Sequence, residues 1–144
     1  MQATDFYSCI AKDFHDSYKN DSNRLERIHV WHSFFDRYLG KADLAYDIGC
    51  GSGILACELA QRGINTIAID GSAGMLAIAR NTAQEFGLAN ITFLEHHLPI
   101  DDTDHFQPAD IIIASSIIEY MDSVTDSLLF LKKLLKDDGI LLFR

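Results

Sequence analysis

The chain has 144 residues, of which 48% are hydrophobic and 23% charged, a composition that fits one globular domain and excludes a disordered chain. Its 21 acidic side chains outnumber the 12 Lys and Arg, so the formal net charge of -9 disfavours duplex nucleic acid as a partner. The clustered Lys132, Lys133 and Lys136 are followed at once by Asp137 and Asp138, which leaves no basic patch.

The three cysteines, Cys9, Cys50 and Cys57, lack CxxC spacing, which argues against a disulfide scaffold and a structural zinc site. The first residues carry neither the basic nor the apolar part of a signal peptide. The longest apolar run, 111–118, is shorter than the roughly 18 residues of a membrane span. We therefore expect a cytoplasmic protein with no membrane segment and no metal.

The first forty residues are rich in aromatic and polar side chains without strand-like alternation. Leu25, Ile28, Trp31 and Phe35 recur at helical spacing, which predicts an amphipathic helix over 23–39 that ends at Gly40. We expect residues 1–40 to form a helical cap or lid over a domain made by residues 41–144.

From residue 43 onward, short apolar runs alternate with helical patterns. Strands are predicted at 44–48, 66–69, 91–94, 110–114 and 139–143, and helices at 53–62, 72–87 and 123–135. This rhythm predicts βαβ units, and hence an α/β fold with a doubly wound parallel sheet. In such a sheet the ligand lies beyond the carboxyl ends of the strands, where the strand order reverses.

A glycine-rich turn, DIGCGSG at residues 47–53, joins the first predicted strand to the first predicted helix of the domain. Such glycines allow a sharp turn and a close approach to a ligand, and the helix N-terminus offers free N–H groups. Residues 51–56 also satisfy the loose GxGxxG/A form of a dinucleotide fold. A tight turn without a ligand is the alternative.

Two aspartates narrow the choice of ligand. Asp70 ends the second strand, nineteen residues after Gly51, where a carboxylate accepts from both ribose hydroxyls of an adenosine; the alternative is a helix cap. Asp47 would face the pyrophosphate of NAD unfavourably, whereas it suits a ligand with positive charge such as S-adenosylmethionine. An Asx-type turn is the alternative role for Asp47.

At this point the chain resembles the class I S-adenosylmethionine-dependent methyltransferases of the small-molecule type. The resemblance runs from about residue 46 to 143 and rests on four motifs in order, at 47–53, 69–76, 110–120 and 134–141. It implies a Rossmann-like sheet in the strand order 3-2-1-4-5. It also implies a cofactor site made of Asp47, Gly49, Cys50, Gly51, Gly53, Asp70, Gly71, Met75, His97, Leu98 and Ser115.

The resemblance also implies individual roles. Asp47 and the carbonyl of Gly49 would hold the methionyl ammonium, the N–H groups around Gly51 and Gly53 would line the methionine moiety, and Asp70 would bind the ribose.

At the adenine, Met75 and Leu98 would sandwich the ring. His97 stands where the family usually has an aspartate for the adenine amino group, and Gly71 stands where a bulkier apolar residue often covers the ring.

The resemblance implies methyl transfer to a small-molecule acceptor, and the sequence assigns no catalytic residue. Candidates for a base are His96, Glu119 and Tyr120, with His15 or Tyr18 from the N-terminal segment. We expect aromatic side chains of that segment to close over the cofactor, namely Tyr7, Phe14 and Tyr18. The alternatives are a non-catalytic or incomplete cofactor-binding domain, a non-methylating use of the cofactor, and a nicotinamide-dependent oxidoreductase of similar fold.

Relatives with this pattern continue past the fifth strand into a helix and an antiparallel strand pair, which this sequence lacks. We therefore expect a C-terminally truncated domain whose fifth strand, with apolar residues at 140–143, is an exposed edge. Because an exposed edge strand offers unpaired N–H and C=O groups, it predicts a homodimer through that edge.

Overall fold

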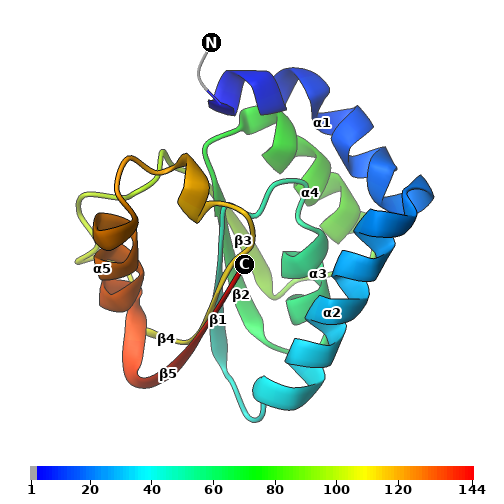
Figure 1. The fold of residues 1–144 in the computed structure, drawn as a ribbon. Coiled ribbons are helices and arrows are strands. Elements are labelled where there is room, and N and C mark those ends of the chain that lie inside the picture. Colours follow the sequence, from blue (N-terminus) through cyan, green and yellow to red (C-terminus); the bar gives the residue numbers. More distant parts are fainter. Residues whose placement is uncertain (1–2) are drawn as a thin grey trace.

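Helices cover both faces of a five-stranded sheet in the computed structural model of the protein, which describes residues 3–144 (Figure 1). The elements follow one another as α1 (Ala3–Asn20), α2 (Ser22–Tyr38), β1 (Leu44–Ile48), α3 (Ile54–Gln61), β2 (Asn65–Asp70), α4 (Ala73–Glu85), β3 (Ile91–Glu95), β4 (Ala109–Ala114), the short 3₁₀ helix η1 (Ile118–Tyr120), α5 (Val124–Leu134) and β5 (Leu135–Phe143). All neighbouring strands are parallel, in the order β3-β2-β1-β4-β5. The predicted fold class is therefore confirmed; residues 1–2 of the predicted cap lie outside the described part.

The core lies on both faces of the sheet, because alternate side chains of each central strand point to opposite sides. On one face Ile111 and Ile113 of β4 pack with Trp31 and Phe35 of α2. On the other face Ile112 packs in the cluster that includes the side chains of α5. Figure 1 shows α2, α3 and α4 on the first side and α5 on the second. This double burial explains the run of consecutive isoleucines in β4.

Local signals place the helix starts closely. Ser72 caps α4 by accepting a hydrogen bond from the N–H of Met75 at 3.2 Å, as its sequence position predicts. Ser123 caps α5 in the same way through the N–H of Asp126. Among the helices of residues 3–144, none combines the length and the hydropathy that a membrane span requires.

The last strand begins earlier than the predicted 139–143. Leu135 pairs with Ala109 directly after α5, and regular pairing with β4 resumes at Ile140 after a register shift. Between these points Lys136 Nζ contacts Asp110 Oδ1 at 2.7 Å. This hydrogen bond lowers the pKa of Asp110 to about 2, helped by backbone N–H donors. A long-range ion pair thus shapes the start of β5.

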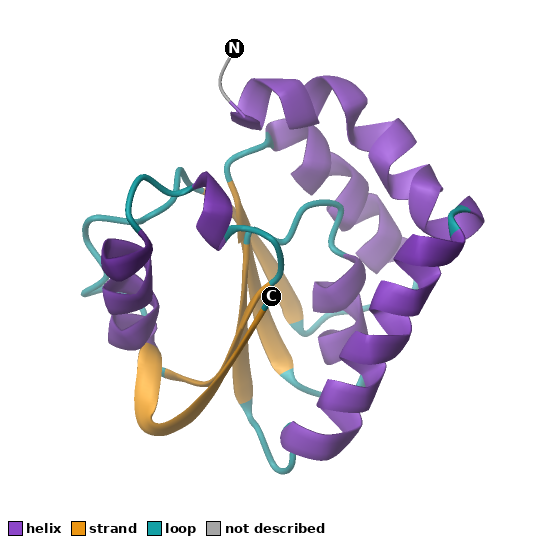
Figure 2. Ribbon diagram, viewed as in Figure 1, coloured by secondary structure: helices purple, strands orange, loops and turns teal. Residues whose placement is uncertain are grey.

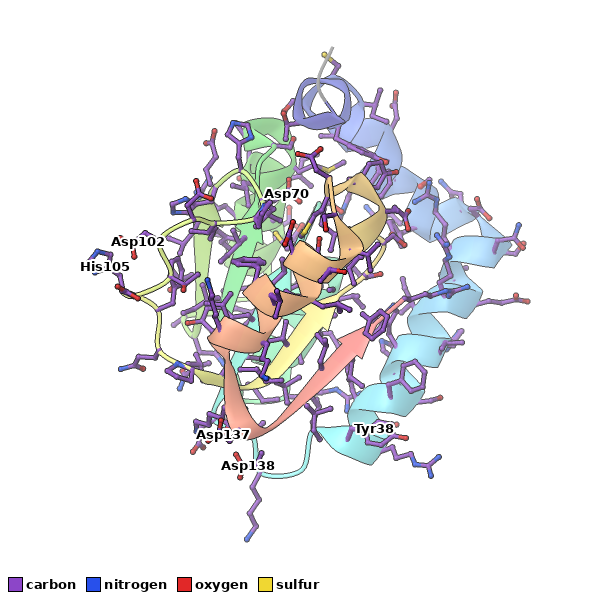
Figure 3. The ribbon with its side chains drawn as sticks, turned by 60° about the vertical axis from the view of Figure 1, so that its left-hand side comes forward. Tyr38, Asp70, Asp102, His105, Asp137 and Asp138 are labelled. Carbon is purple, nitrogen blue, oxygen red and sulfur yellow. The ribbon has the colours of Figure 1, made fainter. Side chains whose placement is uncertain are left out.

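The loops after the strands gather at one end of the sheet, together with α1 and η1 (Figure 2). In Figure 3, Asp70 lies at this end, whereas Asp137 and Asp138 lie at the opposite end. The switch point between β1 and β4 therefore opens toward α1.

Candidate active site

A cavity of about 830 Å³ lies at the carboxyl ends of β1, β2 and β4, and its size is that of a small-molecule site. All predicted cofactor residues except Gly53 line it: Asp47, Gly49, Cys50, Gly51, Asp70, Gly71, Met75, His97, Leu98 and Ser115. Helices α1 and α2 complete the wall. The structure therefore brings together residues from four strand ends and from the N-terminal segment.

The glycine turn after β1 holds its shape for two different reasons. Gly49 has φ +73°, and a Cβ there would lie 2.6 Å from the side chain of Ile117, so this position forms the floor between β1 and β4. Gly53, with φ +80°, begins α3, and its Cβ would lie 2.6 Å from the Cβ of Ala79 in α4. Gly53 thus lies behind the turn, where it lets α3 and α4 approach each other.

Asp70 ties the glycine turn to the end of β2. Its Oδ2 accepts the N–H of Gly51 at 2.8 Å, and its Oδ1 accepts the N–H of Ser72 at 2.8 Å. Burial raises the pKa of Asp70, and these backbone donors oppose the rise. Because each carboxylate oxygen has a second lone pair, Asp70 still has acceptor capacity for a ligand's hydroxyl groups.

Asp47 is a buried carboxylate with one unsatisfied oxygen. It lies in β1, it is 1% exposed, and its Oδ2 has no hydrogen-bond partner among the described residues. Burial and, to a smaller extent, the nearby charge of Asp70 raise the pKa of Asp47 to about 7, although a hydrogen bond from the N–H of Ala56 opposes the rise. An unsatisfied carboxylate oxygen on a cavity wall is costly unless a ligand brings a donor or a positive charge.

The end of the cavity near β3 is made by Met75, His97 and Leu98, with Gly71 between them. A Cβ on Gly71 would lie 2.6 Å from Thr4 Cγ2 of α1 and 3.5 Å from His97 Nδ1. Thr4 therefore fills the space that a larger residue at position 71 would take, which accounts for the glycine.

The wall from α1 is aromatic. Tyr120, Tyr7, Phe14 and Tyr18 form successive edge-to-face pairs with centroid separations of 6.0, 5.7 and 5.5 Å. The hydroxyl oxygens of Tyr7 and Tyr120 are 2.8 Å apart, a hydrogen bond that raises the pKa of Tyr7 to about 12. The guanidinium of Arg24 lies 4.5 Å from the Phe14 ring centre. Tyr7, Phe14 and Tyr18, which the sequence predicts to close over the cofactor, thus line the cavity from α1.

Of the five base candidates, Tyr18, Glu119 and Tyr120 line the cavity, whereas His15 and His96 are not among the described residues that do so. His15 has a buried Nδ1 without a hydrogen-bond partner among the described residues, and burial lowers its pKa. The ring of His96 pairs with Phe106, with 6.3 Å between the ring centres. Burial also raises the pKa of Cys50 well above its ordinary value, so this thiol is protonated and unreactive near neutral pH.

Sequence reasoning missed the cationic part of the wall. Arg24 and Arg27 line the cavity beside Ile28 and Trp31. The sequence predicts Ile28 and Trp31 only as part of the apolar face of a helix. The spacing of positions 24, 27, 28 and 31 places them on one face of α2. This spacing is the only feature of the sequence that could have indicated the two arginines. It predicts a role for them only once the helix face is known to border a cavity.

Comparisons with known proteins agree with this geometry. Residues 46–141, two thirds of the chain, match the family described as a methyltransferase domain. The chain is 33% identical over 100 residues to a ubiquinone biosynthesis O-methyltransferase of Actinobacillus pleuropneumoniae, an alignment that covers 67% of this chain and 43% of that protein. The chain thus spans less than half the length of that relative.

Solved structures show the same fold. An S-adenosylmethionine-dependent methyltransferase of Geobacter sulfurreducens, in complex with S-adenosylhomocysteine, is 27% identical with a TM-score of 0.60 over 70% of this chain and 41% of its own. A methyltransferase of Methanococcus maripaludis, 23% identical, reaches a TM-score of 0.77 over 94% of this chain and 62% of its own. The chain belongs to the class I S-adenosylmethionine-dependent methyltransferases, and S-adenosylmethionine is the cofactor of this family.

Proposed function

We propose that this domain binds S-adenosylmethionine in the cavity and transfers its methyl group to a small-molecule acceptor. The observation that carries the proposal is the buried carboxylate of Asp47, whose Oδ2 has no partner among the described residues and which lines the same cavity as Asp70. A ligand that brings an ammonium and a sulfonium supplies the positive charge that Asp47 lacks, and its ribose supplies the hydroxyl donors that Asp70 can accept. A nicotinamide dinucleotide, with its anionic pyrophosphate, fits Asp47 poorly.

The methionine part of the cofactor has both charges of an amino acid, and the cavity offers a partner for each. Asp47 and the carbonyl of Gly49 are proposed to hold the ammonium. Arg24 and Arg27 of α2, which border the same cavity, are proposed to attract the carboxylate. The turn at Gly51 is proposed to line the chain between the two ends.

The adenosine is proposed to extend toward β3. Asp70 would accept from its ribose, while Met75 and Leu98 would contact the adenine faces. A ring nitrogen of His97 would accept from the adenine amino group. We propose Cys50, Gly71 and Ser115 as the remaining contacts and Gly53 as support for the turn.

When bound, S-adenosylmethionine would supply an electrophilic methyl carbon to the acceptor's lone pair, and the electron pair of the broken carbon–sulfur bond would stay on sulfur. This chain's part is to hold the acceptor in line, for which effective-molarity arguments allow roughly 7–11 kcal/mol. Glu119 and Tyr120 border the cavity, and we propose them as the candidates for taking a proton from the acceptor. The aromatic wall of α1 would exclude water from the reacting atoms.

The aromatic wall also supports an acceptor with a flat or apolar body. The relative from Actinobacillus is an O-methyltransferase by name, which makes small hydroxylated molecules the first acceptors to screen.

We further propose residues 1–40 as a cap on a cofactor-binding domain of residues 41–144. The free thiols of Cys9, Cys50 and Cys57 favour a reducing, cytoplasmic compartment, and the net charge disfavours nucleic acid.

Calorimetric titration with S-adenosylmethionine and S-adenosylhomocysteine tests the proposal. Wild-type protein should bind both, and Asp70→Ala should weaken binding by about tenfold to 100-fold, because it removes charge-assisted hydrogen bonds to the ribose. A screen of small acceptors for methylation follows. Absence of binding to wild type, or binding of NADH instead, would overturn the proposed function.

We also propose that two chains associate through β5. This strand lies at the edge of the described sheet, and Phe143 near its end is 56% exposed. Light scattering between about 1 and 100 µM should show a dimer, and Phe143→Lys, which places a charge at the exposed end of this strand, should shift the equilibrium toward monomer. A wild-type protein that remains monomeric across this range contradicts the proposal.

A further inference from the structure

Helix α1 meets the start of α4 almost backbone to backbone. A Cβ on Gly74 would lie 2.7 Å from the carbonyl oxygen of Ser8 and 2.9 Å from its Cα. Because the neighbouring atoms are main-chain atoms, they cannot move aside as a flexible side chain would, and only glycine at position 74 permits this contact. The seam between the two helices, defined here by Ser8, Ser72 and Gly74, therefore depends on close packing of main chains.

Ser8 also makes polar contacts across this seam. Its Oγ lies 2.7 Å from Ser72 Oγ and accepts the N–H of Gly74 at 3.4 Å. Ser72, which is 1% exposed, accepts the N–H of Met75 with its side chain, and its own N–H donates to Asp70 Oδ1 at 2.8 Å. Two hydrogen bonds, one to the hydroxyl of Ser72 and one from its main-chain N–H, thus link Ser8 of α1 to the carboxylate of Asp70 through the covalent frame of Ser72.

Ser8 and Gly74 are not among the residues of 3–144 that line the cavity. Ser8 therefore acts on a ligand only indirectly, and Ser72 is the cavity-lining residue to which its hydroxyl is hydrogen-bonded. The N–H groups of Ser72 and Gly51 each donate to the Asp70 carboxylate at 2.8 Å and so orient it. The hydrogen bond from Ser8 holds Ser72 in place. Because the N–H of Ser72 donates to Asp70, this contact also sets the direction in which the Asp70 carboxylate presents its remaining lone pairs.

We propose that Ser8 is a positioning residue for the cofactor's ribose, acting through Ser72 on Asp70. The inference rests on the proposed function, since Asp70 must be the ribose-binding group. Docked α1 holds Asp70 in the orientation that accepts the ribose hydroxyls. By reciprocity, an occupied ribose site must strengthen the docking of α1 by the same factor.

Ser8→Ala tests the path directly. Calorimetry should show S-adenosylhomocysteine binding about threefold to tenfold more weakly than to wild type, in line with the loss of neutral hydrogen bonds. The 2′,3′-dideoxy analogue of this ligand should bind Ser8→Ala and wild type equally, because it offers Asp70 no hydroxyl group. A merely structural role of Ser8 would weaken both ligands alike.

Ser17→Ala is the matched control, since Ser17 is on the same helix and its hydroxyl donates within that helix, to the carbonyl of Phe14. It should bind both ligands as wild type does. Gly74→Ala is the second variant: Ala favours α4 as a helix, yet its Cβ would displace α1. It should weaken S-adenosylhomocysteine by tenfold or more, and bound ligand should protect residues 3–20 from proteolysis in wild type more than in this variant.

Wild-type affinity in Ser8→Ala, or an equal loss for the dideoxy analogue, would overturn this inference and leave the proposed function standing. Failure of wild type to bind S-adenosylhomocysteine would instead overturn the proposed function and the inference with it.

Discussion

Asp47→Asn is expected to lose most of the affinity for S-adenosylmethionine while making the empty protein more stable. The substitution removes the proposed partner of the ligand's ammonium, which costs about 2–5 kcal/mol for a buried charge pair, or about 30-fold to several thousand-fold in affinity. It also removes a buried carboxylate whose Oδ2 has no partner among the described residues. Asparagine keeps the shape and loses the charge.

The same carboxylate predicts opposite pH trends for stability and binding. Its pKa is about 7 in the folded chain, against about 3.9 when unfolded, so between these values the folded chain binds more protons. The free energy of unfolding of the empty protein should therefore fall as pH rises from about 4 to 7, by up to about 4 kcal/mol. Affinity for the cofactor should rise over the upper part of that window, by about tenfold per pH unit below about pH 7.

Urea unfolding and calorimetric titration at several pH values measure both trends. In Asp47→Asn both trends should lose the part due to Asp47, which leaves for stability the smaller contributions of groups such as Asp70 and Asp110. Asp102→Asn is the control, because Asp102 lies on a loop with its side chain 67% exposed and is not among the described residues that line the cavity. If Asp47→Asn binds the cofactor as wild type does, Asp47 does not hold the ammonium.

Gly53→Ala is expected to destabilise the fold by about 2–5 kcal/mol. Two costs add: a non-glycine residue at φ +80° is strained, and the new Cβ would lie 2.6 Å from Ala79 Cβ and 3.2 Å from its Cα. The backbone of α4 cannot give way as a long side chain would. Differential scanning calorimetry should show Tm lowered by roughly 5–15 °C for a domain of this length.

Gly63→Ala separates the two costs. Gly63 follows the other end of α3, with a nearly identical φ of +86° and nothing within 4 Å of its Cβ position. This variant should carry only the backbone strain, about 1–2 kcal/mol. Equal losses in the two variants would mean that the approach of α3 to α4 contributes nothing to the requirement for glycine at position 53.

The sheet could be predicted because its determinants are local. The isoleucines of β4 and the cap at Ser72 each act over a few residues, so the alternation of strands and helices and the helix starts follow from pattern and spacing. The strand order is what the family resemblance implies. The position of α1 could not be predicted in this way. Its contacts, such as Thr4 against Gly71 and Ser8 against Gly74, join segments more than sixty residues apart, and no periodicity encodes which glycine receives which helix.

The candidate site divides along the same line. Asp47 and Asp70 are recognisable because strand ends in this fold converge at a known edge. Arg24 and Arg27 are not, because a charged residue beside a helix's apolar face is ordinarily solvated. Gly53 lies in the same motif as Gly49 and Gly51, yet it packs against α4 and does not line the cavity. Spacing alone does not distinguish a glycine that packs against a helix from one that borders a ligand.

The bond between Tyr7 and Tyr120 joins hydroxyl groups that are 113 positions apart in the chain. During synthesis, Tyr7 leaves the ribosome while its partner is still untranslated; at about 5–20 residues per second the delay is roughly 6–23 s. Helix α1 is therefore synthesised well before η1. Until η1 is made, the aromatic side chains of α1 cannot form their contact with Tyr120. A chaperone that covers this helix early would thus act directly on how the cavity is assembled.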